Sequence, residues 1–337
     1  MRPSASSPTD GRPLESVSAE DGGLAEFAAE VSAGLSRCPK TLPCRYLYDD
    51  LGSALFEAIT HLPQYGLTRA EESLLAVTAD RIAEALVPGV LVAELGSGSG
   101  RKTALILDAI LGLQREVTYC PIDISAGALE TCRRRLGLMP GVEVRAVEGE
   151  FLDGLGRLNQ DRRPWPPMLV LFLGSNIGNF DRGQALAFLG GVRRHLRPGD
   201  ALLVGADLRK PVPQLLAAYD DPIGVTAAFN LNLLLRINRQ LGGTFDPRLF
   251  RHEARWSAEH SRVEMHLRSV EDQVVTIGWP AASVRFRAGE TIWTESSYKF
   301  APHDLDDLAR RAGFSPAARW QSDGWAFAES LWMVEGP

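Results

Sequence analysis

The chain has 337 residues, of which 45% are hydrophobic and 23% charged. This balance is typical of a globular protein that buries a sizeable core, in one large domain or two ordinary ones. The formal net charge of -6 argues against a dedicated nucleic-acid binder, because such proteins usually carry a basic field. No apolar run approaches the ~20 residues of a membrane-spanning helix, so we expect neither nucleic acid nor membrane as a partner.

The cysteines indicate a reducing compartment. Cys38, Cys44, Cys120 and Cys132 form no Cys-x-x-Cys pair, and the six histidines are scattered, so we expect no metal. No signal peptide is recognisable, and we expect a cytoplasmic protein with free thiols, working as a monomer. Residues 1–22 are rich in Ser, Pro, Gly and Asp, and we expect them to form a disordered tail.

From about Val87 the chain alternates between short apolar runs and amphipathic stretches. The runs predict buried strands and the stretches predict helices, which gives a parallel sheet with helices on both faces. The expected strands are 89–95, 117–122, 142–147, 168–173 and 201–206, and the expected helices are 101–113, 125–136 and 184–196. Segment 303–334 predicts one further helix and two strands that close the sheet in antiparallel fashion.

Two stretches do not fit this alternation, namely 26–80 and 208–299. The second predicts helices followed by strands, at 213–219, 226–241, 262–268, 273–277 and 282–286. We expect both stretches to combine into a second lobe over the ligand edge of the sheet, because clefts between lobes are common small-molecule sites. The expected division is a cofactor-binding domain (77–207 plus 300–337) and a substrate-binding lobe (24–76 plus 208–299).

A glycine-rich turn follows the first strand, in the segment Glu94-Leu-Gly-Ser-Gly-Ser-Gly100. Glycines allow a sharp turn and a close approach of the backbone to a ligand. A dinucleotide fingerprint has the spacing G-x-G-x-x-G, whereas Gly96, Gly98 and Gly100 have the spacing G-x-G-x-G directly after an acid, Glu94. This spacing favours S-adenosylmethionine over a nicotinamide or flavin dinucleotide.

The next two strands end in residues that suit the same ligand. Asp123 ends the second strand, where a carboxylate can accept both ribose hydroxyls. Glu150 and Phe151 follow the third strand, where a phenyl ring offers a stacking face for adenine. Asp123 as a helix cap and Phe151 as a core residue are the alternatives. The three signals together predict a class I Rossmann-like methyltransferase sheet in an α/β protein, with a nicotinamide oxidoreductase as the competing interpretation.

Several segments resemble one family, the histidine Nα-methyltransferases of ergothioneine biosynthesis. The segments run in order along the chain: Tyr46-Leu-Tyr-Asp-Asp-Leu-Gly-Ser-Ala-Leu-Phe56, Leu62-Pro-Gln-Tyr-Gly-Leu-Thr-Arg-Ala-Glu71, Phe172-Leu-Gly-Ser-Asn-Ile-Gly-Asn-Phe180, Ala217-Ala-Tyr-Asp-Asp-Pro222, Phe229-Asn-Leu-Asn232, Arg262-Val-Glu-Met-His-Leu267 and Thr294-Glu-Ser-Ser-Tyr-Lys-Phe300. The resemblance implies trimethylation of histidine to hercynine with three molecules of S-adenosylmethionine.

The resemblance also implies site residues. The contacts to S-adenosylmethionine fall on Gly96, Lys102, Asp123, Glu150 and Phe151, beside Glu94 and Gly98 of the glycine-rich motif. The contacts to the amino acid fall on Tyr65, Asn179, Tyr219, Glu295 and Ser297, with Met265 lining the side-chain pocket and Ser296 next to it. Tyr65 and Asn179 would orient the reacting amino acid, Tyr219 its carboxylate, and Glu295 and Ser297 its imidazole.

Each of these residues also has a structural interpretation. Tyr65 and Tyr219 suit a core, Asn179 suits a helix cap, Glu295 an exposed strand and Met265 a core position.

Three positions depart from the family pattern: Asn176 stands where threonine is common, Ser296 where a small apolar residue is common, and Gly66 where a second tyrosine is common. Another aromatic amino acid, such as tryptophan or a derivative, is therefore the alternative acceptor. A non-catalytic binding module is disfavoured by the intact motif and by the Tyr, Asn and Glu set.

Overall fold

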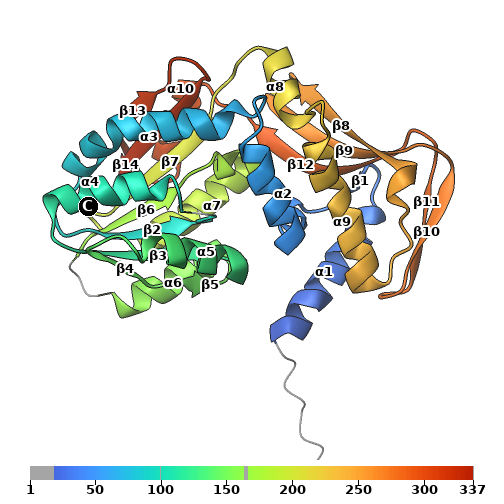
Figure 1. The fold of residues 1–337 in the computed structure, drawn as a ribbon, viewed down its shortest axis with the longest axis horizontal. Helices are drawn as coiled ribbons and strands as arrows, with labels where there is room; N and C mark the ends of the chain where they lie inside the picture. The colour runs from blue at the N-terminus through green and yellow to red at the C-terminus, as the bar shows by residue number, and fades with distance from the viewer. Residues whose placement is uncertain (1–18, 99, 163–165, 337) are drawn as a thin grey trace, which may run out of the picture.

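The computed structural model describes residues 19–98, 100–162 and 166–336, which form two bodies side by side (Figure 1). The larger body is built on an eight-stranded sheet in the order β13-β14-β7-β6-β2-β3-β4, with β5 paired to β3. Its strands are β2 (Leu91–Leu95), β3 (Val117–Asp123), β4 (Val142–Val144), β5 (Val147–Glu148), β6 (Met168–Phe172), β7 (Ala201–Asp207), β13 (Ser315–Gln321) and β14 (Phe327–Met333).

The sheet is parallel from β7 to β4, while β14 runs antiparallel to both β7 and β13. Every residue of β6 and β7 is buried, as expected for parallel strands with helices on both faces. This arrangement confirms the predicted class I methyltransferase sheet with its antiparallel finish. It also shows that the predicted strand 142–147 consists of two short strands.

Helices cover both faces of this sheet (Figure 1). One face packs against α3 (Gly66–Glu84), α4 (Thr103–Leu113) and α5 (Ala126–Leu136), and the other against α6 (Phe151–Asp161), α7 (Arg182–His195) and α10 (Pro302–Arg311). Two of these helices begin at caps that their sequence provides. Ser125 caps α5, and Asp181 forms a capping box with Gln184 at the start of α7.

The smaller body holds a four-stranded sheet in the order β1-β12-β9-β8 and a separate hairpin. The sheet consists of β1 (Lys40–Thr41), β8 (Phe250–Ser257), β9 (Arg262–Ser269) and β12 (Thr291–Tyr298), and the hairpin of β10 (Gln273–Ile277) and β11 (Ala282–Phe286). Its helices are α1 (Ala19–Leu35), α2 (Asp50–Thr60), α8 (Val212–Tyr219) and α9 (Val225–Leu241). Short 3-10 turns occupy η1 (Cys44–Leu47), η2 (Asn176–Asn179) and η3 (Pro247–Leu249).

Two boundaries differ between the sequence prediction and the structure: the first crossing between the two bodies and the start of the first helix. Helix α3 packs against α4 and β14 of the large sheet, so the first part of the chain crosses between the bodies near Tyr65 rather than at residue 76. Helix α1 begins at Ala19, inside the expected tail 1–22, whose first eighteen residues lie outside the described part of the chain. Strands β8 and β12 were not predicted, because neither sequence keeps a sustained alternation of apolar and polar residues.

Two features are absent from the described residues. In the described ranges no helix is both long and apolar enough to cross a bilayer. Within the same ranges no group of three or more His, Cys, Asp and Glu side chains is placed to hold a metal ion. All four cysteines are described and are free thiols.

Candidate active site

The turn after β2 adopts the backbone conformation that its glycines predict. Gly96, Gly98 and Gly100 have φ angles of 80°, 48° and 67°, in the left-handed region that side chains disfavour. A Cβ atom on Gly96 would lie 3.1 Å from Nδ2 of Asn176 and 3.4 Å from Cζ of Phe151. The turn therefore lies close to Asn176 and Phe151 at the carboxyl ends of the parallel strands, where such sheets bind ligands, and we call this region the cradle.

Asp123 faces this turn from the end of β3. Its Oδ1 accepts a hydrogen bond from the backbone N–H of Ser125 at 3.0 Å. Burial raises the pKa of its carboxyl, and the backbone N–H groups of Ser125 and Gly98 act in the opposite direction. The cap of the following helix is Ser125 and not Asp123, which leaves the carboxylate beside the glycine-rich turn.

Glu150 and Phe151 lie on the other side of the turn, at the start of α6. Glu150 is the exposed residue that precedes the helix, and its side chain makes no capping bond. The Phe151 ring packs against Phe172 and Phe188, with centroids 6.0 and 6.1 Å apart, and stays half-buried. One side of the ring therefore remains close to Gly96, as a stacking role for adenine requires.

The side chains of Glu94 and Lys102 both interact with other side chains of the protein. Oε2 of Glu94 accepts hydrogen bonds from Thr103 Oγ1, at 2.8 Å, and from the Tyr119 hydroxyl. Burial raises the pKa of Glu94 to about 7 even though both hydroxyls oppose the rise. Lys102 forms an ion pair with the fully buried Glu71. Direct contact of Glu94 and Lys102 with the methyl donor stays a prediction.

Glu71 links the methyl-donor side to the neighbouring pocket, and the sequence analysis gave it no role. Besides pairing with Lys102, it accepts the backbone N–H of Gly174 at 2.5 Å through Oε1. Gly174 begins the turn after β6, where Ser175 holds the left-handed angles φ 58° and ψ 27°. Strain of this kind occurs mostly where a site needs an unusual backbone path.

A pocket opens between the two bodies next to this turn, with about 480 Å³ of space outside protein atoms, solvent at its mouth included. Six of the predicted amino-acid contacts line it: Tyr65, Asn179, Tyr219, Met265, Glu295 and Ser297. They come from segments that are up to 232 positions apart in the chain.

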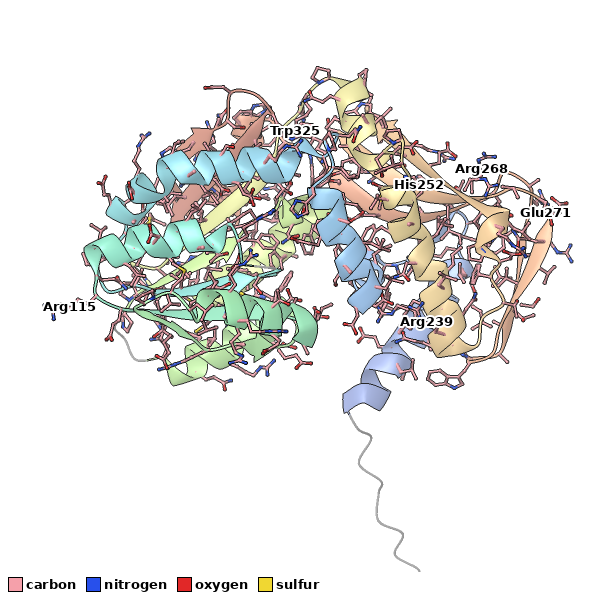
Figure 2. All side chains as sticks on the ribbon, viewed as in Figure 1. Arg115, Arg239, His252, Arg268, Glu271 and Trp325 are labelled. Atoms are coloured by element: carbon pink, nitrogen blue, oxygen red, sulfur yellow. The ribbon has the colours of Figure 1, made fainter. Side chains whose placement is uncertain are left out.

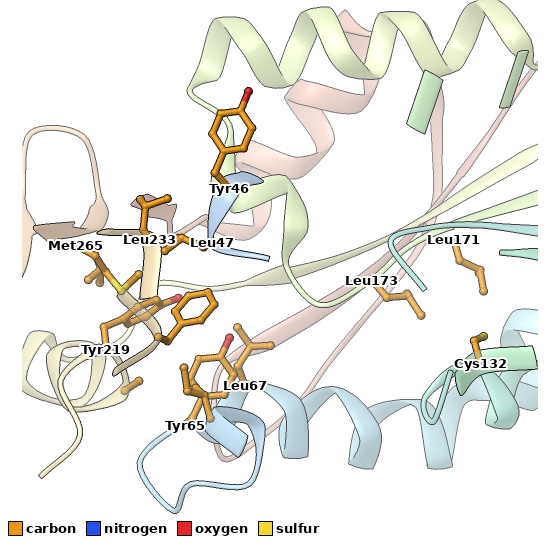
Figure 3. Close-up of a cluster of buried hydrophobic side chains, with 14 of the residues drawn as sticks. Tyr46, Leu47, Tyr65, Leu67, Cys132, Leu171, Leu173, Tyr219, Leu233 and Met265 are labelled. Carbon is orange, nitrogen blue, oxygen red and sulfur yellow. The ribbon is translucent and has the colours of Figure 1, made fainter. Parts of the chain in front are cut away.

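Two tyrosines frame the pocket. The rings of Tyr65 and Tyr219 meet edge to face with centroids 6.2 Å apart, and Figure 3 shows both beside Met265, away from Leu171 and Cys132 in the large body. Asn179 is the last residue of η2, and the cap of α7 is Asp181 instead. The capping interpretation of Asn179 is therefore wrong.

Glu295 lies on β12 directly opposite Met265 of β9. It is 8% exposed, which rules out the interpretation as an exposed strand residue. Burial raises the pKa of its carboxyl to about 7, while Lys299 and a hydrogen bond with Tyr48 lower it. Ser297 follows on the same face of the strand and accepts a hydrogen bond from the Tyr219 hydroxyl at 2.7 Å.

The expectation for Ser296 is wrong. Side chains alternate between the faces of a strand, so Ser296 projects away from the face that carries Glu295 and Ser297. It pairs instead with Glu264 on the outer face of the sheet, and it does not line the pocket. Asn176, another of the three positions that depart from the family pattern, does line the pocket.

Three aromatic residues of the pocket were missed as site residues, namely Tyr48, Phe56 and Phe229. Tyr48 and Phe229 have ring centroids 5.4 Å apart, and Phe56 lies 6.0 Å from Phe229. The family resemblance could have indicated them as site residues, since all three belong to segments that carry it. Nothing in their residue type alone distinguishes them from core aromatics.

The pocket adjoins the cradle of the glycine-rich turn. Asn176 lines the pocket, and its Nδ2 is the atom closest to a Cβ built on Gly96. A methyl donor in the cradle and an acceptor in the pocket would thus meet at the turn after β6. The sheet, the acidic strand ends and this junction define a class I S-adenosylmethionine-dependent methyltransferase.

The comparisons with known proteins agree. Residues 27–334 match the model of the family described as histidine-specific methyltransferases that depend on S-adenosylmethionine, and the chain belongs to this family. The chain is 39% identical over 319 residues to the histidine N-alpha-methyltransferase of Mycolicibacterium smegmatis, covering 94% of this chain and 98% of that protein. The Mycobacterium tuberculosis protein of the same name is 40% identical over 313 residues, covering 93% of this chain and 96% of that protein.

A more distant relative is named for another activity. The 4-dimethylallyltryptophan N-methyltransferase of Arthroderma benhamiae is 28% identical over 306 residues, covering 88% of this chain and 89% of that protein.

Proposed function

We propose that this enzyme methylates the α-amino nitrogen of L-histidine and continues to the trimethylated betaine, hercynine. One observation carries the proposal: a buried carboxyl and a hydroxyl, Glu295 and Ser297, stand together beside the methyl-donor cradle, in a pocket that five aromatic side chains also line. Imidazole combines an apolar ring with two polar nitrogens, so it matches this lining. The two mycobacterial relatives carry the name of this activity.

The residues present fit S-adenosylmethionine. The left-handed glycines leave room for close approach to the backbone, Asp123 offers a carboxylate for ribose hydroxyls, and Phe151 offers a ring for adenine. When bound, the sulfonium supplies an electrophilic methyl carbon. The protein has to bring a neutral amine into line with that carbon.

The pocket residues can achieve this alignment without a strong base. Tyr65 and Asn179, which stand nearest the junction in our proposal, orient the amino acid while adding no charge. As the N–C bond forms and the C–S bond breaks, the amine must lose a proton before each new attack, and solvent at the pocket mouth can accept it.

Glu295 also matches imidazole in acidity. Its pKa of about 7 is close to the ~6.5 of an unperturbed histidine side chain, so the two groups can share a proton in a buried site. The alternative acceptor is another aromatic amino acid, such as tryptophan or a derivative. The aromatic side chains of Tyr48, Phe56 and Phe229 favour it, and the relative from Arthroderma benhamiae has such a substrate in its name.

We also propose that the enzyme acts as a cytoplasmic monomer and needs no metal ion. Cradle and pocket are both formed by one chain, so the site does not depend on a second copy. Transfer from a sulfonium needs no Lewis acid, because the leaving sulfide is neutral.

An acceptor scan tests the proposal. We expect kcat/KM for histidine to exceed that for tryptophan about 100-fold or more, since a site built for ring hydrogen bonds rejects rings that leave them unmade. The measurement is transfer of labelled methyl from S-adenosylmethionine to each of the proteinogenic amino acids in parallel. Methylation of tryptophan with histidine left unchanged would favour the alternative.

A further inference from the structure

A buried lysine stands directly behind the pocket. Lys299 follows β12, and its side chain is fully buried. Its Nζ donates to the Tyr219 hydroxyl and to Ser297 Oγ, both at 2.8 Å, and pairs with Asp207 Oδ2 at 2.8 Å. The ammonium, which has three protons, thus donates two hydrogen bonds and faces a carboxylate oxygen.

Asp207 anchors this lysine. Its Oδ1 is bonded by Lys210 and by Trp325 Nε1, the latter at 2.9 Å. Burial acts to raise the pKa of Asp207, but Lys299 and Lys210 hold it below its usual range. Figure 2 places Trp325 where the two bodies meet, so the carboxylate fixes the lysine at this junction.

The hydrogen bonds that Ser297 accepts leave only its own hydroxyl proton free for a further hydrogen bond. Its oxygen accepts from the Tyr219 hydroxyl at 2.7 Å and from Lys299 at 2.8 Å. A hydroxyl oxygen has two lone pairs, so both acceptor positions are filled. Ser297 lines the pocket, and its own proton remains for a hydrogen bond to what the pocket holds.

We propose that Lys299 is a positioning residue that makes Ser297 a hydrogen-bond donor to the bound ring, and thereby selects neutral imidazole. This inference rests on the proposed function. Neutral imidazole has one N–H, which Glu295 can accept, and one lone-pair nitrogen, which Ser297 can serve. Imidazolium and indole have no lone-pair nitrogen, so each would leave the Ser297 proton without an acceptor.

The first test replaces Lys299 with methionine and uses Lys210→Met as its matched control. Lys210 is bonded to the same carboxylate and its side chain is only 3% exposed, but among its described contacts are Asp207 and the Leu208 carbonyl and no pocket residue. We expect K299M to raise the KM for histidine about 30-fold, the effect of one misdirected hydrogen bond to a buried group. K210M should stay within about threefold of wild type, and the Kd for S-adenosylmethionine should be unchanged in both.

A double-mutant cycle separates positioning from general damage. In a Ser297→Ala background, adding K299M should change the KM for histidine less than about threefold, because the donor is already gone. A full 30-fold loss in that background, or equal losses in K299M and K210M, would overturn the proposal. If wild type itself does not methylate histidine, the proposed function fails instead, so the two failures are distinguishable.

A ligand-side measurement keeps the inference testable even if K299M does not fold. The probe is 3-(2-pyrrolyl)alanine, which has a ring N–H but no lone-pair nitrogen. Wild type should bind it about 30-fold more weakly than histidine in titration calorimetry with S-adenosylhomocysteine present. Equal binding of both amino acids would show that Ser297 does not donate to the ring.

Discussion

Replacing Glu295 with alanine is expected to raise the KM for histidine about 100-fold while leaving the Kd for S-adenosylmethionine unchanged. Among the described residues that line the pocket, Glu295 has the only carboxyl group. Its loss removes a charge-assisted hydrogen bond of ~1.5 to 3 kcal/mol, which corresponds to a factor of about 10 to 150 in affinity. Steady-state kinetics with each substrate varied in turn measure both constants.

The matched control is Glu264→Ala. Glu264 lies on the neighbouring strand but on the outer face, where it pairs with Arg262 and His266. Its replacement should leave the KM for histidine within about threefold of wild type. Equal losses in the two variants, or an equal loss for the methyl donor in E295A, would contradict a ring-binding role for Glu295.

The raised pKa of Glu295 gives this prediction a pH signature. Because the pKa of Glu295 is about 7, the carboxylate that accepts an N–H is lost as the pH falls through 7. Histidine affinity in wild type should therefore weaken below that pH. Glu295→Gln should lack this component and keep only the titration of the amino acid itself.

Replacing Asp123 with alanine is expected to weaken S-adenosylmethionine binding about 100-fold or more. The carboxylate faces the glycine-rich turn and is partly desolvated already, so two ribose hydroxyl bonds to it would each contribute ~1.5 kcal/mol or more. Titration calorimetry with S-adenosylhomocysteine measures the change, and Asp123→Asn should give an intermediate value.

Asp153→Ala serves as its control, because Asp153 is an exposed acid in the first turn of α6. It should leave the affinity near that of wild type. If D123A lowers the thermal stability but binds S-adenosylhomocysteine as tightly as wild type does, Asp123 only supports the turn at Ser125.

The sheet could be predicted because its signals are local. Apolar runs such as Met168–Phe172 admit hardly any interpretation but a buried strand, and the glycines after Glu94 require the turn that the structure contains. The smaller body was harder. Strand β12 carries Glu295 and Ser297 on one face and has a bulge between Trp293 and Glu295, which breaks the alternating pattern.

The site was predictable only where motif and residue type agreed. Glu71, Lys299 and Asp207 each bond at least one partner that is more than 30 positions away, and no spacing in the sequence reveals such contacts. Ser296 shows the converse error, since a neighbour in sequence lies on the opposite face of a strand.

The most direct test of the histidine assignment is the structure of the product. Wild-type enzyme with L-histidine and excess S-adenosylmethionine labelled in its methyl group should yield one final product, identified by mass spectrometry and NMR as histidine with three labelled methyls on the α-nitrogen. Label on a ring nitrogen, or no labelled product from histidine while another aromatic amino acid is methylated, would contradict the account.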